Sequence, residues 1–232
     1  MAVRIIGRDV ETDAQRVFDV VHGGGVALIP LDVGYAVLGR TRGSVERIYA
    51  AKQRSFAKPT GIVGNHALHE ALHVLDERKL GIVRAITQDY DLPLAVIAPY
   101  RPDHPLLQDL DPFVLKNAVK DGTLNILLNA GQLRNRIADI AVARGVLFVG
   151  SSANVSLRCI RYRLGDVDPE LRRITDIEID YGLAAYHNSE GKSSTMIDFS
   201  TFRVQRAGVC FDRIAAIMKK DFGIELQSRI ED

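Results

Sequence analysis

GGGVALIPLDVGYAVLG, residues 23–39, is the stretch that decides the fold. A glycine turn at 23–25 leads into an apolar run at 26–31, and a second apolar run follows Asp32 at 35–39. Short apolar runs bounded by Gly and Pro predict buried strands. We therefore expect two consecutive strands joined at a Pro30-to-Asp32 corner that exposes side chains at a sheet edge. A plain hairpin is the alternative.

Further apolar runs predict more strands, and segments of helical period separate them. The strand candidates are LPLAVIA at 92–98, LNILL at 124–128, VLFVG at 146–150, TMIDFS at 195–200 and FRVQR at 202–206. Helical faces are predicted around Val17, Leu68 and Ile137, and residues 211–223 predict a C-terminal helix that ends at Gly223 and packs at the sheet edge. This alternation favours an α/β fold, a twisted mixed or parallel sheet flanked by helices.

The composition is that of an ordinary globular chain. Of 232 residues, 47% are hydrophobic and 25% charged, and no repeat or linker is visible, so we expect a single domain over residues 1–232. The net charge of +1 means that a polyanion would have to bind a local basic patch. Two distant cysteines, no apolar leader and no apolar stretch of roughly 20 residues predict a cytoplasmic protein without membrane contact.

AAKQRSFAKP, residues 50–59, places Lys52, Arg54 and Lys58 at the end of a predicted helix. In a continuous helix Lys52 and Arg54 would point about 200° apart, so both can reach one anion only if the helix ends near Gln53. An Arg fork and a mobile Lys together suit phosphate. The alternative is a solvated helix end, where cations interact favourably with the helix dipole.

Two other segments offer small polar groups at strand ends. VLFVGSSANVS at 146–156 follows a buried strand with residues that let backbone N–H groups approach an anion, although Ser and Asn are also common in turns. EGKSSTMIDFS at 190–200 lacks the earlier glycine of a P-loop, which excludes that motif. The candidate anion contacts of the two segments and the strand that follows are Ser151, Ser152, Asn154, Ser194, Thr195 and Arg206.

Two more patterns have competing explanations. His66, His69 and His73 stand at helical spacing and could bind a metal, but without a metalloprotease motif a solvated polar face is the preferred interpretation. A basic run around Tyr162 has the composition of a nucleic-acid contact, diluted by nearby acids. Its members are Arg158, Arg161, Arg163, Arg172 and Arg173.

In order and approximate spacing, PLDVGYAVLG, KQR, SSANVS, SSTMID and VQRAG resemble the motifs of the YrdC/YciO family, in the threonylcarbamoyl-AMP synthase superfamily. That family's pattern runs Pro-Thr-Asp/Glu-Thr-x-Tyr-Gly, Lys-x-Arg, Ser-x-Asn, Ser-Thr-x-x-Asp and Arg-x-Gly. The resemblance covers roughly residues 14–210 and leaves 211–232 as a helical extension, and the first motif is closer to the YciO branch. It implies a twisted sheet with a concave basic face.

The resemblance also implies an activity, the joining of L-threonine, bicarbonate and ATP into threonylcarbamoyl-AMP for a tRNA modification, with Mg²⁺ but without a metal site in the protein. By position, Lys52, Arg54, Ser152 and Asn154 would be the catalytic tetrad around nucleotide and carbonate. The predicted nucleotide contacts are Lys58, Ser151, Ser194, Thr195 and Arg206. The predicted substrate contacts are Asp32 and Tyr35.

The chain departs from the family pattern at several substrate positions. Leu31 and Val33 replace two threonines, Ala36 replaces a glycine, Leu127 stands near the family's Arg-x-Pro arginine, and Ala95 stands where threonine is common. A site that loses such hydrogen-bonding groups can lose several powers of ten in discrimination, which leaves open a substrate other than threonine. Two alternatives remain: a non-catalytic paralogue that binds nucleotide or double-stranded RNA, and a carbamoyltransferase that acts through carbamoyl-adenylate.

Overall fold

The 23–39 stretch forms a hairpin inside one large sheet. The structure is a computed structural model that describes residues 3–6, 9–156 and 158–226. β2 (Ala27–Leu31) and β3 (Gly34–Gly39) pair antiparallel with Leu31 opposite Gly34, so the hairpin alternative is confirmed. The expectation of a corner at a sheet edge is wrong, because β2 lies beside β9 (Ile177–Asp180) and β3 beside β8 (Phe148–Ser152).

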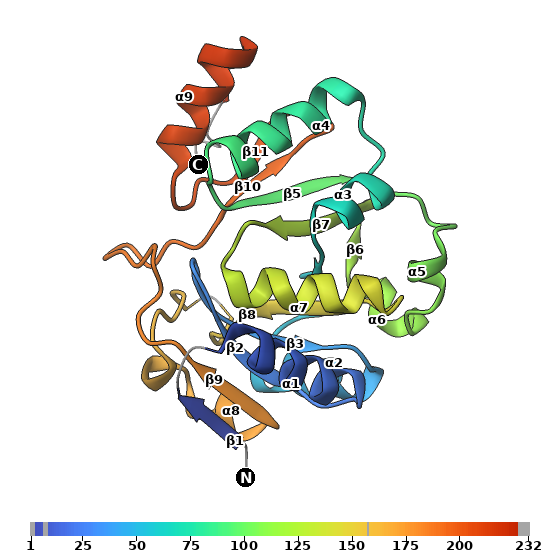
Figure 1. Ribbon diagram of the computed structural model, residues 1–232, viewed down its shortest axis with the longest axis vertical. Coiled ribbons are helices and arrows are strands. Elements are labelled where there is room, and N and C mark those ends of the chain that lie inside the picture. The colour runs from blue at the N-terminus through green and yellow to red at the C-terminus, as the bar shows by residue number, and fades with distance from the viewer. Residues whose placement is uncertain (1–2, 7–8, 157, 227–232) are drawn as a thin grey trace.

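The sheet is mixed, as predicted, and helices flank it (Figure 1). Among the described residues it contains eleven strands. Its order is β1-β9-β2-β3-β8-β4-β7-β5-β10-β11, and β6 pairs with β7 off this path. The remaining strands are β1 (Val3–Ile6), β4 (Gly61–Val63), β5 (Leu94–Pro99), β6 (Val119–Lys120), β7 (Thr123–Leu128), β10 (Thr195–Asp198) and β11 (Arg203–Arg206). The β1–β9, β2–β9, β4–β7 and β5–β10 pairs are parallel.

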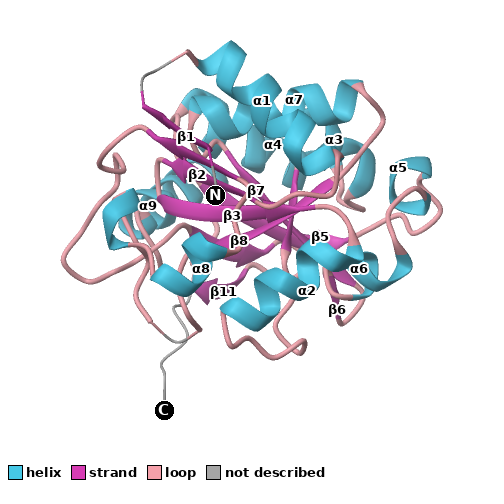
Figure 2. Ribbon diagram, turned by 90° about the horizontal axis from the view of Figure 1, so that it is seen from below, coloured by secondary structure: helices cyan, strands magenta, loops and turns pink. Residues whose placement is uncertain are grey.

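Helices cover both faces of the sheet. α1 (Val10–His22) and α7 (Gln132–Ala143) pack on one face, and α2 (Arg42–Ala51) and α8 (Pro169–Arg173) lie on the other (Figure 2). Neighbouring residues of β2 face opposite ways: Ile29 joins the core under α1 and α7, and Leu28 joins the core on the α8 side. Burial on both faces explains why this strand reads as a continuous apolar run.

The other half of the sheet has its own core. α3 (His66–Leu72), α4 (Glu77–Arg84) and α9 (Phe211–Phe222) contribute apolar residues that pack with β5, β7 and β10. The C-terminal helix is therefore confirmed, and Gly223 ends it with φ 67°. The shorter helical segments are a π-helix at Ala85–Asp89, α5 (Pro105–Gln108), α6 (Pro112–Lys116) and a 3₁₀ turn at Leu164–Asp166. Residues 227–232 of the predicted extension lie outside the described residues.

The histidines of α3 do not form a solvated polar face, so that interpretation is wrong. His69 and His73 are each 1% exposed, and their Nδ1 atoms lie 2.7 Å apart. The chain at 99–101 covers them, because Tyr100 bridges to His73 and Arg101 donates to the carbonyl of His73 at 3.0 Å. Burial lowers the pKa of both rings, and neither Nε2 has a hydrogen-bond partner in the part of the chain that the structure describes.

Within the described ranges, no three His, Cys, Asp or Glu side chains gather in a way that could hold a metal ion. No helix in those ranges combines the length and the apolar character that a bilayer crossing requires. Cys159 and Cys210 are both free thiols.

Candidate functional site

A cavity of about 180 Å³ opens on the sheet beside α7. Residues of β3, β4, β7, β8 and β10 line it, together with the end of the β2–β3 hairpin. Within the described ranges, the charged side chains in its lining are Arg54, Arg134 and Arg206, and no Asp or Glu lines it. None of these arginines forms an ion pair with a carboxylate in the part of the chain that the structure describes. A cavity with three unpaired cations and no acid favours an anionic ligand.

The helix before the first two cations ends where the sequence analysis expected. α2 stops at Ala51, Lys52 is its C-cap, and Gln53 takes φ 48°, which turns the chain out of the helix. Arg54 then reaches the cavity wall, where Nε and Nη2 donate to the carbonyls of Lys58 and Pro59 at 3.1 and 2.7 Å. These two carbonyls fix the direction of the guanidinium and leave its charge without an acidic partner.

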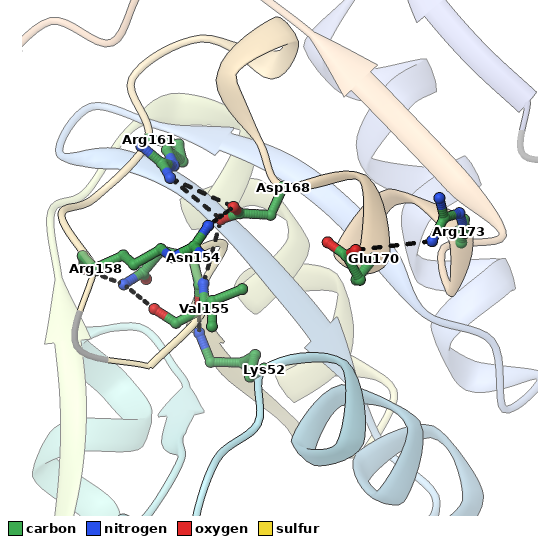
Figure 3. Close-up of polar contacts among 8 residues, drawn as sticks. All are labelled: Lys52, Asn154, Val155, Arg158, Arg161, Asp168, Glu170 and Arg173. Atoms are coloured by element: carbon green, nitrogen blue, oxygen red, sulfur yellow. Dashed lines mark hydrogen bonds and ion pairs between the residues drawn. The ribbon is translucent and has the colours of Figure 1, made fainter.

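Lys52 does not line the cavity. It is 1% exposed, and its Nζ donates to the backbone carbonyl of Ser152 and, at 2.6 Å, to that of Asn154 (Figure 3). Burial lowers the pKa of Lys52 to about 7, and the charge of Arg54 lowers this pKa by more than the charge of Asp168 raises it. Lys52 therefore holds the loop after β8 against the end of α2.

The end of β8 and the loop after it carry three of the predicted polar residues, and the last two residues of β8 line the cavity. Ser151 and Ser152 line the cavity, and Ser152 pairs with Ala36 of β3. Asn154 turns away, and its Nδ2 donates to the carbonyls of Val155 and Arg158 at 3.2 and 2.5 Å. Its Oδ1 is buried without a partner.

Asp168 anchors this loop from outside the cavity. Its carboxylate accepts from Arg158 at 2.7 Å, from Arg161 at 3.4 Å and from the backbone N–H of Val155 at 3.4 Å (Figure 3). Partial burial raises the pKa of Asp168, but the Val155 N–H and the two arginines outweigh it and hold that pKa below its ordinary value. The cations here stabilise the loop.

Two further arginines of the basic run are paired, whereas Arg163 is exposed and forms no ion pair among the described residues. Arg172 donates to Glu178 at 2.7 Å, and Arg173 lies 3.8 Å from Glu170. These ion pairs, with those of Asp168, offset most of the charge that suggested a nucleic-acid contact. RNA binding remains a prediction.

The end of β11 supplies the third arginine. Arg206 Nε donates to the carbonyl of Ser194 at 2.9 Å and Nη2 to its Oγ at 3.0 Å, and both residues line the cavity. Thr195 is fully buried, donates to the Val209 carbonyl at 2.8 Å and accepts from the Gly208 N–H at 3.2 Å. Thr195 thus fixes the turn after β11 and does not line the cavity.

The other predicted contacts lie apart from the cavity or are already engaged. Asp32 lines a separate hollow with Gly131 and Tyr181, and Lys58 is exposed and does not line the cavity. Tyr35 is in the cavity lining, but its hydroxyl lies 3.0 Å from both Asp180 Oδ1 and the Gly182 carbonyl and can donate to one of them at a time. Burial raises the pKa of Tyr35 strongly, so the hydroxyl stays neutral.

All five departures from the family pattern face the cavity. Its lining contains Leu31, Val33, Ala36, Ala95 and Leu127, and Met196 extends this apolar wall. The cavity therefore combines apolar walls with three cations.

Two polar residues of the cavity were missed by the sequence analysis, Arg134 and Asn125. A usable signal existed for Arg134, because it lies three residues before Ile137 on the apolar face of α7, where the helical period calls for a hydrophobic residue. Asn125 gave no comparable signal, since it alternates normally with buried Leu124 and Ile126 along β7.

Neither the known family models nor the curated proteins match this sequence. Solved structures do match. The hypothetical protein smu.1377c from Streptococcus mutans UA159 superposes with TM-score 0.79 at 19% identity over 98% of both chains. Sua5 of P. abyssi complexed with L-threonine gives TM-score 0.73 at 16% identity, over 98% of this chain and 62% of that one.

The chain has the Sua5/YciO fold. YciO of E. coli matches over 85% of this chain and 90% of its own, with TM-score 0.59 and 17% identity. The predicted fold class is thereby confirmed, while the closer relation to the YciO branch stays a prediction.

Proposed function

We propose that this protein is an ATP-dependent enzyme that forms a carbamoyl-type adenylate from bicarbonate and a small amine. The observation that carries the proposal is the cavity itself, lined by three arginines without carboxylate partners. Bicarbonate, a carbamate and a triphosphate are all anions, so each step of this reaction places negative charge where the arginines lie.

The proposed chemistry has two steps. The amine attacks bicarbonate and forms an N-carboxylate with release of water. A carboxylate oxygen then attacks the α-phosphorus of ATP, the bond to the β-phosphate bridging oxygen breaks, and pyrophosphate leaves. Neither step needs a covalent nucleophile from the protein, so positioning and charge stabilisation would supply the catalysis.

The residues around the cavity differ in how exposed they are to solvent, and this suggests different roles. Arg54 is half-buried and Arg206 exposed, so both suit phosphate groups that enter from solvent. Ser151 and Ser152 line the same cavity and offer neutral hydrogen-bonding groups. Lys52 would act through the loop that it holds, as a positioning residue.

Mg²⁺ fits this proposal only as part of the nucleotide substrate. The ion prefers carboxylate, phosphate and water oxygens, and the cavity lining offers no carboxylate. Phosphate oxygens would therefore hold the metal, which would reduce the charge of the triphosphate.

Two structural neighbours support the ligand classes. The Sua5 structure holds L-threonine, and a HypF structure in a phosphate- and nucleotide-bound form matches 80% of this chain with TM-score 0.59 and 13% identity. The present chain spans 62% of Sua5 and 27% of HypF, so the activities of those whole proteins come to this chain only as part of the proposal.

The test is pyrophosphate release with ATP, Mg²⁺, bicarbonate and a panel of amino acids. Turnover that requires both bicarbonate and an amine supports the proposal. Turnover with carbamoyl phosphate in place of bicarbonate and amine would favour the carbamoyltransferase alternative. Double-stranded RNA binding without any turnover would favour the non-catalytic alternative.

A pair of variants tests the site. Arg54→Ala removes a charged hydrogen-bond donor, which is worth about 1.5–3 kcal/mol, and should weaken ATP binding about 10- to 100-fold. Lys58→Ala removes an exposed cation of the same loop that is outside the cavity lining, so it should change ATP binding less than about threefold. Equal effects of the two variants would contradict the site.

A further inference from the structure

Arg134 is in an unfavourable position for stability. It is 3% exposed, and burial lowers its pKa to about 10. Its one hydrogen bond among the described residues runs from Nη1 to the Gly64 carbonyl at 2.6 Å. It is also the third residue of α7, and a cation in the first turn of a helix opposes the helix dipole.

The charge of Asp139 raises the pKa of Arg134, but by less than burial lowers it, and no acid forms an ion pair with Arg134 within the described ranges. A buried cation is normally paired, because removal from water without a partner is costly. Two guanidinium nitrogens, Nε and Nη2, have no partner in those ranges, and the residue lines the cavity. An arginine with an unused hydrogen-bonding edge on a cavity is well suited to bind a carboxylate in a bidentate manner.

Asn125 adds a second unsatisfied group to the same cavity. Its side chain lies over Gly61, where an added Cβ would come 3.3 Å from Nδ2, and its buried Oδ1 has no hydrogen-bond partner among the residues that the structure describes. Gly61 begins β4, and the Gly64 that accepts from Arg134 follows the end of that strand. The two unsatisfied side chains therefore flank one short strand.

The remaining walls determine what else the ligand carries. Leu31, Val33, Leu127 and Met196 offer no hydrogen bond from their side chains, so a hydroxyl placed against them would be buried without a partner. The cavity holds about 180 Å³, below the roughly 300–1,000 Å³ of pockets that enclose drug-sized ligands. A small molecule with one carboxylate, one amine and a short apolar side chain matches all three features.

We propose that Arg134 binds the carboxylate of the amine substrate, and that this substrate is a small α-amino acid with an apolar side chain such as that of valine. The amide of Asn125 would accept from the amine. This assignment rests on the proposed function, in which ATP is the other substrate. The binding of the amino acid can nevertheless be measured without ATP.

Calorimetric titration of the full chain with L-valine, L-threonine and isobutylamine tests the proposal. Isobutylamine is valine without its carboxylate, and threonine replaces one methyl by a hydroxyl. We expect L-valine to bind about tenfold or more tightly than either. Equal affinity for valine and isobutylamine in the wild type, or no binding of valine at all, would overturn the proposal, and this comparison needs no variant.

Variants of α7 provide the second test. Arg134→Met should weaken L-valine binding about 10- to 100-fold and leave isobutylamine binding unchanged. Arg134→Lys should recover part of the loss, because it keeps the charge without the fork. Arg136→Met is the matched control: Arg136 lies two residues along the same helix, is partly exposed, pairs with Glu11 and should have no effect on either ligand.

A purely structural role would lower thermal stability and would affect both ligands alike. If Arg134→Met does so, the proposal is overturned. The outcomes also separate this proposal from the proposed function. Arg134-dependent valine binding without pyrophosphate release would refute only the adenylation chemistry, and turnover that prefers threonine and is unaffected by Arg134→Met would refute only the assignment made here.

Discussion

Replacement of Lys52 by methionine should change how the stability of the protein depends on pH. The folded-state pKa of Lys52 is about 7, well below the ordinary value of 10.5. Below pH 7 the lysine is protonated in both states, whereas between pH 7 and 10.5 the unfolded chain binds the extra proton. The free energy of unfolding of the wild type therefore rises with pH over that window.

The magnitude follows from the size of the window. Each pH unit between the two pKa values contributes about 1.36 kcal/mol, so from pH 7 to pH 9 the wild type should gain up to about 2.7 kcal/mol relative to Lys52→Met. Loss of the proton from Lys52 does not release the loop after β8. The neutral amine keeps two N–H groups, and Nζ contacts two carbonyls. Methionine keeps most of the buried stem, so packing changes little.

Urea unfolding followed by circular dichroism at pH 6, 7, 8 and 9 measures this difference. Lys58→Met is the control, because Lys58 is exposed and its ammonium has no described partner. The reasoning would be refuted if the difference in free energy of unfolding between the wild type and Lys52→Met stayed constant from pH 6 to pH 9. That result would mean that Lys52 remains fully charged in the folded protein.

Three other outcomes follow from the structure. Gly208→Ala should lower the melting temperature and ATP affinity, because an added Cβ would lie 2.1 Å from the Ser193 carbonyl; Gly165→Ala, with nothing within 4 Å, should do neither. Asp168→Asn should cost about 1–3 kcal/mol in urea unfolding at pH 7, since it weakens charged hydrogen bonds that hold the loop after β8. Between pH 6.5 and pH 4.5 the wild type should lose free energy of unfolding as the pH falls, because both folded-state pKa values are lowered and only the unfolded chain gains protons there. The double variant His69→Leu, His73→Leu should lose less over the same range.

β2 and β3 could be predicted as continuous apolar runs because every residue in both strands is buried. Four strands were missed: β1, β4, β6 and β9 are at most four residues long, and β9 carries Glu178. Glu178 is 4% exposed and accepts from Arg172 through both carboxylate oxygens. Only the tertiary structure makes that burial tolerable, so a local pattern could not reveal it.

The convergence of the early helix end with the distant strand tip was also predictable. Lys52 reaches the carbonyls of Ser152 and Asn154, and Arg54 shares a cavity with Ser152. The sequence could not show that Lys52 would donate its hydrogen bonds to backbone carbonyls, because every residue type has a backbone carbonyl. Nor could it show that the serines would line the same cavity as Arg134, which depends on where α7 packs.

The pairing of β3 with β8 joins Ala36 to Ser152, more than a hundred residues apart along the chain, and β4 then pairs on the other side of β8. Loop closure over such distances is entropically expensive and makes folding slow. While β8 is still inside the ribosome, the strand that joins the β2–β3 hairpin to β4 is missing from the sheet. Ligand affinity should thus emerge abruptly and late during synthesis, after most of the polypeptide has left the exit tunnel.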